Sequence, residues 1–423
     1  MLKWTSGTGS SGSCGAYARS SSPARAGPNR RTWWPLSARA NKGARTVTPC
    51  ATPIPQRRVT IAIADLRRGG AQRVAAWLAG ALVERGHAVT LLLLGGPEQE
   101  QAFAVHPEVR LVHADILWFS RGLRRLPDFF LRLAHIRRAV RESQPQALLC
   151  FLDFVNVRVL TACLGLCLPT AVCERIDPRL DPLPLVWRAA RRLLYPLAQA
   201  LVIQTEGLRA AWPARWNPRL RIISNPVRRL KACGSVALPP HTILSVARLD
   251  TQKGLNLLIR AFAHIAKEQN AHLVLAGSGP LRDELSALAA SLGVGERVQL
   301  PGAIEDVGAW LEAAEIFVLS SHYEGQPNAL AEAMAAGLPV VTTDTPGARS
   351  LVRHGENGLV VPRGDVAALA SAMRTLLTEP DKAAALGRAA QDMATELSEE
   401  CILGQWTALV EELAGQPGAD SGS

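Results

Sequence analysis

Short apolar, β-branched runs alternate along the chain with segments whose apolar residues recur at helical spacing. The first unit begins with the run Val59 to Ala64, continues as a helical pattern that ends at Arg85, and closes with a second run, Val89 to Leu94. This order predicts a βαβ unit. The same alternation continues and indicates a parallel sheet with helices on both faces. Its further predicted strands are Ala147 to Leu152, Thr170 to Cys173 and Leu201 to Gln204.

A second block of the same design follows a Pro- and Gly-bearing stretch, Asn225 to Pro240, which we interpret as an interdomain linker. Its predicted strands are Thr242 to Val246, His272 to Ala276, Val298 to Leu300, Ile316 to Ser320, Pro339 to Thr342 and Gly358 to Val361. Its predicted helices are Leu255 to Lys267, Leu281 to Leu292, Val307 to Ala313 and Asn328 to Ala336, with further helical segments from Asp365 to Glu412.

We therefore predict an α/β protein with two Rossmann-like, parallel-sheet domains that face each other across a cleft. The first domain is expected over residues 58–225 and the second over 241–395. A helix and tail over 396–423 are expected to close the chain.

The net charge of +11 is concentrated at one end of the chain. Residues 1–58 hold ten Lys or Arg and no acid, so that 37 of the 47 basic residues remain elsewhere, against 36 acidic ones. Nucleic acid is therefore not a predicted partner. Residues 1–57 lack any apolar periodicity and are predicted to be a disordered basic extension. Their composition fits an organellar transit peptide, and equally a misassigned start or a segment not native to the protein.

The cysteines show no metal-binding spacing, so we predict reduced thiols in a cytoplasmic protein and no bound metal. They are Cys14, Cys50, Cys150, Cys163, Cys167, Cys173, Cys233 and Cys401. The most apolar stretch, residues 147–173, is interrupted by Asp153, Asn156 and Arg158. No run therefore reaches the roughly 18 to 20 residues that span a bilayer.

A basic amphipathic helix is predicted between Arg121 and Arg141. Its apolar residues at helical spacing are Leu126, Phe129, Phe130, Leu133 and Val140, and its arginines include Arg124, Arg125, Arg132, Arg137 and Arg138. Such a helix can lie on an anionic membrane, at the inner face in a cytoplasmic enzyme. It can equally pack its apolar side on its own sheet. Both interpretations stay open.

Candidate chemistry gathers in the second block. Glu324 follows a predicted strand, and Glu332 lies two turns into the next helix. Parallel α/β domains bind ligands at the carboxyl ends of their strands, where carboxylates suit the vicinal hydroxyls of a ribose or hexose. The helix start at Asn328 offers free N–H groups to a diphosphate. Arg248 and Lys253 follow another strand of the same sheet, and there they can neutralise the charge on a departing phosphate.

Two glycine-bearing loops are candidate phosphate sites. Gly277 and Gly279 follow a third strand, but Arg282 stands where a dinucleotide fingerprint needs its third glycine. A hydride-transfer enzyme is therefore not favoured. In the first domain, Gly69 and Gly70 open the first helix. They either let the backbone approach an anionic or sugar group closely or form a tight turn.

Several segments occur in the order found in one enzyme family. VARLDTQKG, LAGSGP, EGQPNALAEAMAAGLPVV, TDTPGA and ENGLVVP, from Val246 onward, resemble glycosyltransferase family 4. LRRGGAQRV resembles the family's first loop, and CERIDP and IISNPV resemble segments of members that build lipid-linked oligosaccharides or surface polysaccharides. The resemblance implies a GT-B fold and a retaining, metal-independent transfer that needs no cofactor beyond a nucleotide sugar.

The resemblance also assigns roles to residues. Arg248 and Lys253 would hold the diphosphate, Glu332 the ribose and Glu324 the donor sugar. The remaining donor-binding positions would be Gly277, Gln326, Pro327 and Asn328.

Family members often carry a first-domain His near the donor sugar, but VCERIDP has none. Glu174 and Arg175 are therefore candidates beside the acceptor, together with the loop of Gly69 and Gly70. The remaining first-domain histidines have no assigned role: His87, His106, His113 and His135.

The expected function is transfer of a hexose or N-acetylhexosamine, from a donor expected to be UDP-linked, to a lipid-linked glycan or surface polysaccharide precursor. A UDP-sugar 2-epimerase or a glycogen-type phosphorylase of the same fold is an alternative, and an epimerase would consume the nucleotide sugar without an acceptor. A non-catalytic sugar-binding subunit is another, and it would bind the donor without releasing nucleotide.

Overall fold

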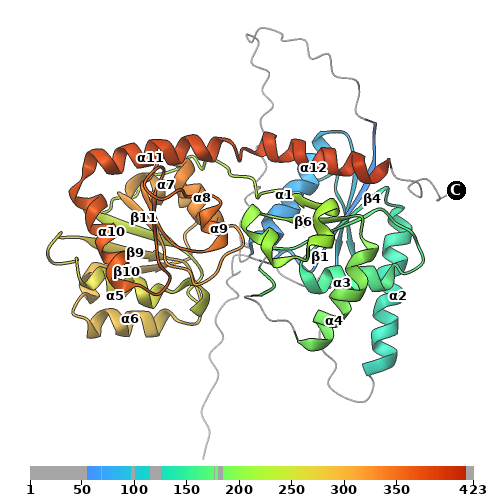
Figure 1. The fold of residues 1–423 in the computed structure, drawn as a ribbon, viewed down its shortest axis with the longest axis horizontal. Coiled ribbons are helices and arrows are strands. Elements are labelled where there is room, and N and C mark those ends of the chain that lie inside the picture. Colours follow the sequence, from blue (N-terminus) through green and yellow to red (C-terminus); the bar gives the residue numbers. More distant parts are fainter. Residues whose placement is uncertain are drawn as a thin grey trace, which may run out of the picture.

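The computed structural model contains two α/β domains side by side, each built on a parallel sheet (Figure 1). The predicted fold class is therefore confirmed. Of the predicted extension over 1–57, only residues 55–57 belong to the part of the chain that is described. The structure describes residues 55–67, 69–96, 101–114, 125–175, 177–179 and 184–415.

The first sheet has seven strands in the order β3-β2-β1-β4-β5-β6-β7, all paired in parallel. The order reverses between β1 and β4, which is where α/β sheets open a crevice for ligands. β3 and β7 were not anticipated from the sequence, because β3 is only half-buried and β7 is three residues long. The strands are β1 Arg58–Ile63, β2 Ala88–Leu93, β3 Arg110–His113, β4 Ala147–Phe151, β5 Thr170–Cys173, β6 Ala200–Ile203 and β7 Leu220–Ile222.

Helices cover both faces of this sheet. α1 packs on one face, while α2 and α3 pack on the other and α4 lies against α3. The helices are α1 Gly70–Glu84, α2 Arg125–Ser143, α3 Asp153–Ala162 and α4 Leu185–Leu194, with 3-10 turns at Tyr195–Leu197, Glu206–Ala211 and Ala214–Arg219.

The second sheet has six parallel strands in the order β10-β9-β8-β11-β12-β13. They are β8 Thr242–Val246, β9 His272–Ala276, β10 Val298–Gly302, β11 Ile316–Leu319, β12 Val340–Thr343 and β13 Leu359–Val361. The order again reverses at the centre, between β8 and β11, so each domain has its own switch point.

Helices also cover both faces of the second sheet. α5, α6 and α10 pack on one face, and α7 and α8 on the other, while α11 contributes residues to both cores. α5 ends four residues before the predicted limit at Lys267, since the chain continues from His264 in turns. The helices are α5 Leu255–Ala263, α6 Arg282–Ser291, α7 Val307–Ala313, α8 Asn328–Ala335, α9 Pro346–Arg349, α10 Val366–Thr378 and α11 Pro380–Thr395, and 3-10 turns occupy Thr251–Lys253 and Gly295–Arg297.

The last helix, α12 (Glu399–Ala414), returns to the first domain. In Figure 1, the red α11 runs over the second domain, and α12 continues over the first. Trp406 of α12 is fully buried and stacks on Phe151 at 5.7 Å between ring centroids. The outgoing and returning segments are joined by a 2.8 Å hydrogen bond from the Val227 N–H to the Leu397 carbonyl. Two adjacent crossings therefore connect the domains.

We predict that Trp406→Ala destabilises the first domain, because it removes the largest buried side chain of α12. Removing a buried Trp costs about 3 to 5 kcal/mol, and this should appear as a lower free energy of unfolding in urea. The control is Leu292→Ala, at a side chain that is 36% exposed. A loss in the Trp406 variant no larger than in the control would contradict the packing role of α12.

Candidate functional site

The carboxyl edges of the two sheets meet at the domain boundary. From the first domain, the loops after β1, β5 and β7 bring Gly70, Arg175 and Asn225 to this boundary. From the second domain, the loop after β11 brings Gly325 and the start of α8. The boundary is therefore lined by the edges at which parallel sheets bind ligands.

Lys253 and Glu324 form a partly buried ion pair in this region. The Lys253 Nζ lies 2.5 Å from the Glu324 Oε1, and the two side chains are 16% and 8% exposed. The Ser321 hydroxyl donates to the same oxygen at 2.7 Å. Gly254, at a φ of +57°, lets the loop pass close to β11, where a Cβ would lie 2.4 Å from the Ser320 carbonyl oxygen. Two sequence-predicted site residues thus lie together.

Arg248 does not join this pair. Its side chain is 66% exposed, and its guanidinium contacts the Asp250 carboxylate at 3.0 Å and the Gln252 amide oxygen at 3.1 Å. Gln252 in turn donates to the Tyr323 carbonyl at 2.9 Å, next to Glu324. Arg248 is therefore at the predicted edge, with its charge directed to solvent and to Asp250.

Glu332 is paired across the domain boundary. Its carboxylate, 8% exposed, accepts a hydrogen bond from the guanidinium of Arg73, which lies in the first turn of α1. From the sequence, Arg73 is expected only to make the mouth of the first loop positive, together with Arg67 and Arg68, and its pairing with Glu332 is not predicted. The position of Arg73 in LRRGGAQRV could have indicated this contact. Arg73 lies three residues after Gly70, and residues three apart in a helix lie on the same face.

Asn225 is a second site residue that sequence reasoning missed. Its side-chain amide donates to the Asn328 side-chain oxygen at 2.8 Å, and its backbone N–H donates to the Gln326 side-chain oxygen at 2.5 Å. The Gln326 amide donates back to the Asn225 carbonyl at 3.3 Å. In the sequence, Asn225 belongs to IISNPV, which indicates only the acceptor class, and begins the predicted linker.

Glycines allow loops to touch at the boundary. A Cβ on Gly325 would lie 1.9 Å from the Arg175 carbonyl oxygen, so the two domains meet there backbone to backbone. Within the second domain, Gly277 has a φ of +148°, and its Cβ would lie 1.8 Å from the Ala247 carbonyl oxygen. Gly277 is thus required for packing beside the loop of Arg248.

The starts of α1 and α8 lie close together. A Cβ on Gly70 would lie 3.0 Å from the Asn328 side-chain nitrogen, and neither helix has an acid in its first turn. Gly69 precedes α1, and Pro327 precedes α8. Two helix N-termini, each with unpaired N–H groups and partial positive charge, therefore border the same space. Such an arrangement favours an anion.

Glu174 and Arg175 are both buried at the carboxyl end of β5. Glu174 accepts a hydrogen bond from the Tyr195 hydroxyl, and burial raises its pKa to about 7. Arg175 stacks on Phe151 at 4.6 Å and donates to the Asn225 side-chain oxygen at 2.8 Å. Burial lowers the pKa of Arg175 to about 10, and its Nε and Nη2 have no hydrogen-bond partner among the described residues. An uncompensated cation therefore stands behind the boundary.

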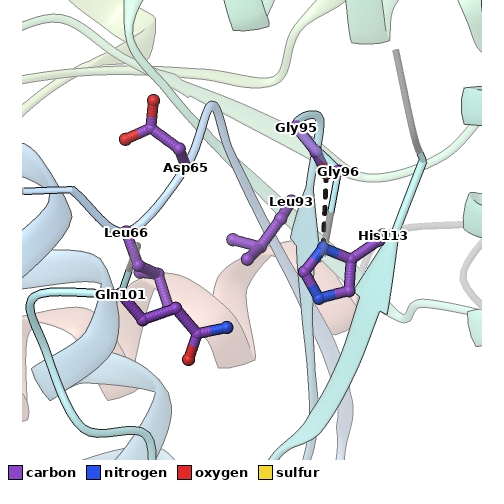
Figure 2. Close-up of a pocket in the computed structure, with 7 residues that line it drawn as sticks. All are labelled: Asp65, Leu66, Leu93, Gly95, Gly96, Gln101 and His113. Carbon is purple, nitrogen blue, oxygen red and sulfur yellow. Dashed lines mark hydrogen bonds between the residues drawn. The ribbon is translucent and has the colours of Figure 1, made fainter. Parts of the chain in front are cut away.

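A shallow surface hollow lies at the carboxyl ends of β1, β2 and β3 (Figure 2). Its polar lining includes Asp65, Gln101 and His113, whose Nδ1 lies 3.3 Å from the Gly95 carbonyl oxygen. His87 lies instead next to the amino end of β2, where its Nδ1 accepts from the Arg57 N–H at 3.3 Å. His113 is thus the one among the four unassigned histidines that lines this hollow.

Two sequence families cover most of the chain. The family described as "Glycosyl transferases group 1" matches residues 235–393, and the family described as "Glycosyltransferase Family 4" matches residues 68–229. The first match contains all six strands of the second sheet, and the second match contains β2 to β7 of the first sheet but begins after β1. The chain therefore belongs to the glycosyltransferases of the family 4 type, and it is an enzyme of that class.

Relatives of similar length carry related names. The chain is 27% identical over 361 residues to a Campylobacter jejuni enzyme named "GalNAc-alpha-(1->4)-GalNAc-alpha-(1->3)-diNAcBac-PP-undecaprenol alpha-1,4-N-acetyl-D-galactosaminyltransferase", which covers 84% of this chain and 99% of the relative. It is 28% identical over 359 residues to the lipopolysaccharide core biosynthesis glycosyltransferase LpsE of Rhizobium meliloti, covering 82% and 97%.

Solved structures share the fold over the same extent. Sucrose-phosphate synthase from Thermosynechococcus elongatus superposes with a TM-score of 0.74 at 20% identity, over 84% of this chain and 98% of that one. HepE from Anabaena, solved with UDP and glucose, gives 0.68 at 19% identity, over 84% and 99%. Both support the GT-B architecture.

We predict a pH-dependent stability that arises at Glu174. Its pKa is about 7 in the folded protein against an ordinary 4.5, so between these values the folded state binds more protons than the unfolded state. The free energy of unfolding should therefore decrease as pH rises from about 4.5 to about 7. Glu174→Gln removes the titrating carboxyl group and therefore this pH dependence.

The melting temperature of the Glu174→Gln variant minus that of the wild type should therefore be larger at pH 8 than at pH 5. Calorimetry at both pH values checks it. An unchanged difference would show that the carboxylate is ionised in the folded protein.

Proposed function

We propose that this glycosyltransferase moves a hexose or N-acetylhexosamine from a UDP sugar to a lipid-linked glycan or polysaccharide precursor, with retention of configuration. One observation carries the proposal: the Lys253–Glu324 pair, Glu332 and the starts of α1 and α8 lie together at the domain boundary. The PP-undecaprenol-linked glycan in the name of the Campylobacter relative and the lipopolysaccharide core biosynthesis in the name of the Rhizobium relative support the acceptor class. The UDP in the HepE structure supports the base.

The donor's diphosphate would lie between the starts of α1 and α8. Unpaired N–H groups there stabilise negative charge without reorganising, which is the largest contribution to catalysis in many enzymes. Lys253 adds a mobile cation next to this region, because its partner Glu324 can turn to a sugar hydroxyl. Arg248, on an exposed side chain, can leave Asp250 for a phosphate oxygen.

The transfer itself needs no protein nucleophile. The acceptor hydroxyl oxygen forms a bond to the anomeric carbon on the face from which the diphosphate departs, and the bond to the diphosphate oxygen breaks. That oxygen takes the hydroxyl proton, so charge and atoms balance. We propose that no metal or other cofactor takes part, since Lys253, Arg248 and the helix starts supply the positive charge.

The ribose of the donor and the polar groups of the acceptor would contact the remaining polar residues of the boundary. Glu332 would accept hydrogen bonds from the ribose hydroxyls through the oxygen that Arg73 leaves free. Asp65, Gln101 and His113, at the carboxyl ends of β1 to β3, would form hydrogen bonds with hydroxyl groups of the acceptor. The buried cation of Arg175 would attract the phosphate of a lipid-linked acceptor toward the boundary.

We also propose that the enzyme contacts the inner face of a membrane through one side of its first domain. The predicted helix between Arg121 and Arg141 begins outside the described residues, and α2 covers the rest. Val140 packs on the sheet, whereas Phe130 and Leu131, 64% and 60% exposed, do not. The packing interpretation therefore holds for Val140, while the exposure of Phe130 and Leu131 supports the proposed membrane contact.

α4 extends this exposed apolar surface. Trp187, Ala190 and Leu194 pack against the core, while Leu185, Val186 and Leu193 are 73%, 78% and 76% exposed. Arg188 and Arg192, one turn apart and exposed, border that apolar stripe. Figure 1 shows α2, α3 and α4 on the same side of the domain. Among the described residues no helix has the length and apolarity to cross a bilayer, so contact would be at the surface.

The catalytic assignment predicts that Lys253→Met lowers kcat by about 100-fold or more, because a cation that stabilises the leaving group contributes on that order. Arg248→Ala should also suppress transfer. Glu332→Gln should mainly weaken UDP binding, measured by calorimetry. Turnover is followed as UDP released from UDP sugars with a membrane lipid extract.

Lys267→Met, at an exposed position of the second domain, is the matched control and should retain activity. Full turnover in both the Lys253 and Arg248 variants would refute the assignment. Consumption of the UDP sugar without any lipid extract would instead favour an epimerase.

The membrane proposal predicts that Val186→Glu combined with Leu193→Glu prevents sedimentation with vesicles of phosphatidylglycerol and phosphatidylcholine. Each inserted apolar side chain contributes about 1.5 to 3 kcal/mol, so binding should weaken by more than about tenfold. Leu292→Glu, in the second domain, is the control. Equal sedimentation of both proteins would exclude α4 from the contact.

A further inference from the structure

We propose that Arg73 and Asn225 are positioning residues with which the first domain completes the nucleotide-sugar site of the second domain, so that nucleotide binding and domain closure are coupled. The inference rests on the proposed role of Glu332 and α8 in nucleotide binding. It adds that these groups are held in place from the opposite domain, by residues that need not touch the transferred sugar.

Asn225 uses all its polar groups within the protein. Its backbone N–H and carbonyl both pair with the Gln326 amide, and its side chain donates to Asn328. Its side-chain oxygen accepts from Arg175 and from Gln204, each at 2.8 Å. Because the residue is 3% exposed and saturated, it offers nothing to a ligand. Its role is to fix the loop that begins α8.

Arg73 fixes the next residue along the same helix. It reaches from α1 to the Glu332 carboxylate and contacts Oε1 alone. An ion pair between an exposed Arg and a buried carboxylate orients that carboxylate and leaves its second oxygen for a ribose hydroxyl. Arg73 and Asn225 therefore act on opposite ends of one short segment, Gln326 to Glu332.

The consequence is a thermodynamic linkage. A nucleotide that contacts Glu332 and the start of α8 binds best when the first domain holds them, and it therefore stabilises the closed arrangement. Coupling between two such sites usually changes affinity by about 5- to 150-fold. Loss of either positioning residue should weaken nucleotide binding and raise the KM for the donor more than it lowers kcat.

The first test is a double-mutant cycle on UDP binding, measured by calorimetry. Arg73→Met keeps the length of the side chain and should weaken UDP binding about tenfold, and Arg73→Lys should restore part of it. In a Glu332→Gln background, Arg73→Met should have no further effect, because it acts through that carboxylate. An undiminished effect there would overturn the positioning role. Arg85→Met, at the other end of α1, is the control.

The second test concerns Asn225. Asn225→Ala should weaken UDP binding and raise the donor KM, whereas Asn357→Ala should do neither. Asn357 is an equally buried Asn that bonds within the second domain, to Leu351 and Arg353. If both variants lower UDP affinity to the same extent, the effect is one of stability and the proposal fails.

The third test needs no ligand. Small-angle scattering should give a larger radius of gyration for the Arg73→Met and Asn225→Ala double variant than for the wild type, because the domains separate. An unchanged radius overturns the proposal. Failure of the proposed function gives a different result. If Glu332 does not bind the nucleotide, Glu332→Gln alone leaves UDP binding unchanged, while the difference in radius of gyration between the double variant and the wild type remains.

Discussion

The boundary between the two domains depends on a contact between two backbones. Gly325 carries no side chain, and this lets the loop after β11 lie directly on the backbone of Arg175 in the first domain. Any Cβ there would occupy the position of a carbonyl oxygen, so the two sheets could not bring their carboxyl edges together. The same Arg175 side chain lies on Phe151 and Trp406. The returning helix α12 therefore packs directly behind the point at which the domains touch.

Charge at the boundary is nearly balanced without a ligand. Lys253 is paired with Glu324, Arg73 with Glu332 and Arg248 with Asp250. The diphosphate of the proposed donor would add negative charge, which the helix starts and the cations released from these pairs would stabilise. Arg175 differs from these residues, because no acid pairs with it among the described residues, and desolvation lowers its pKa to about 10. A buried, unpaired cation lowers the stability of the fold unless an anion binds to it.

The sequence predicted what depends on local pattern, and it did not predict what depends on how the domains meet. The apolar runs located most strands, and the rule that ligands lie at carboxyl ends brought Lys253 and Glu324 to one place, where the structure has them paired. β7 escaped because three residues show no periodicity. Arg73 and Asn225 escaped for another reason: each contacts a residue more than a hundred positions away, in the other domain. No spacing within one element encodes such a pair.

The helices on the two faces of the first sheet leave its carboxyl edge free. α1 and α12 cover one face and α2 and α3 the other, whereas the boundary with the second domain lies along the carboxyl ends of the strands. Core packing explains only the buried side of α4, since its exposed side carries three large apolar residues that gain nothing from the fold. If that side lies on a membrane, as proposed, the first domain rests on the bilayer surface. A lipid-linked acceptor would then reach the domain boundary while its chain stays in the membrane.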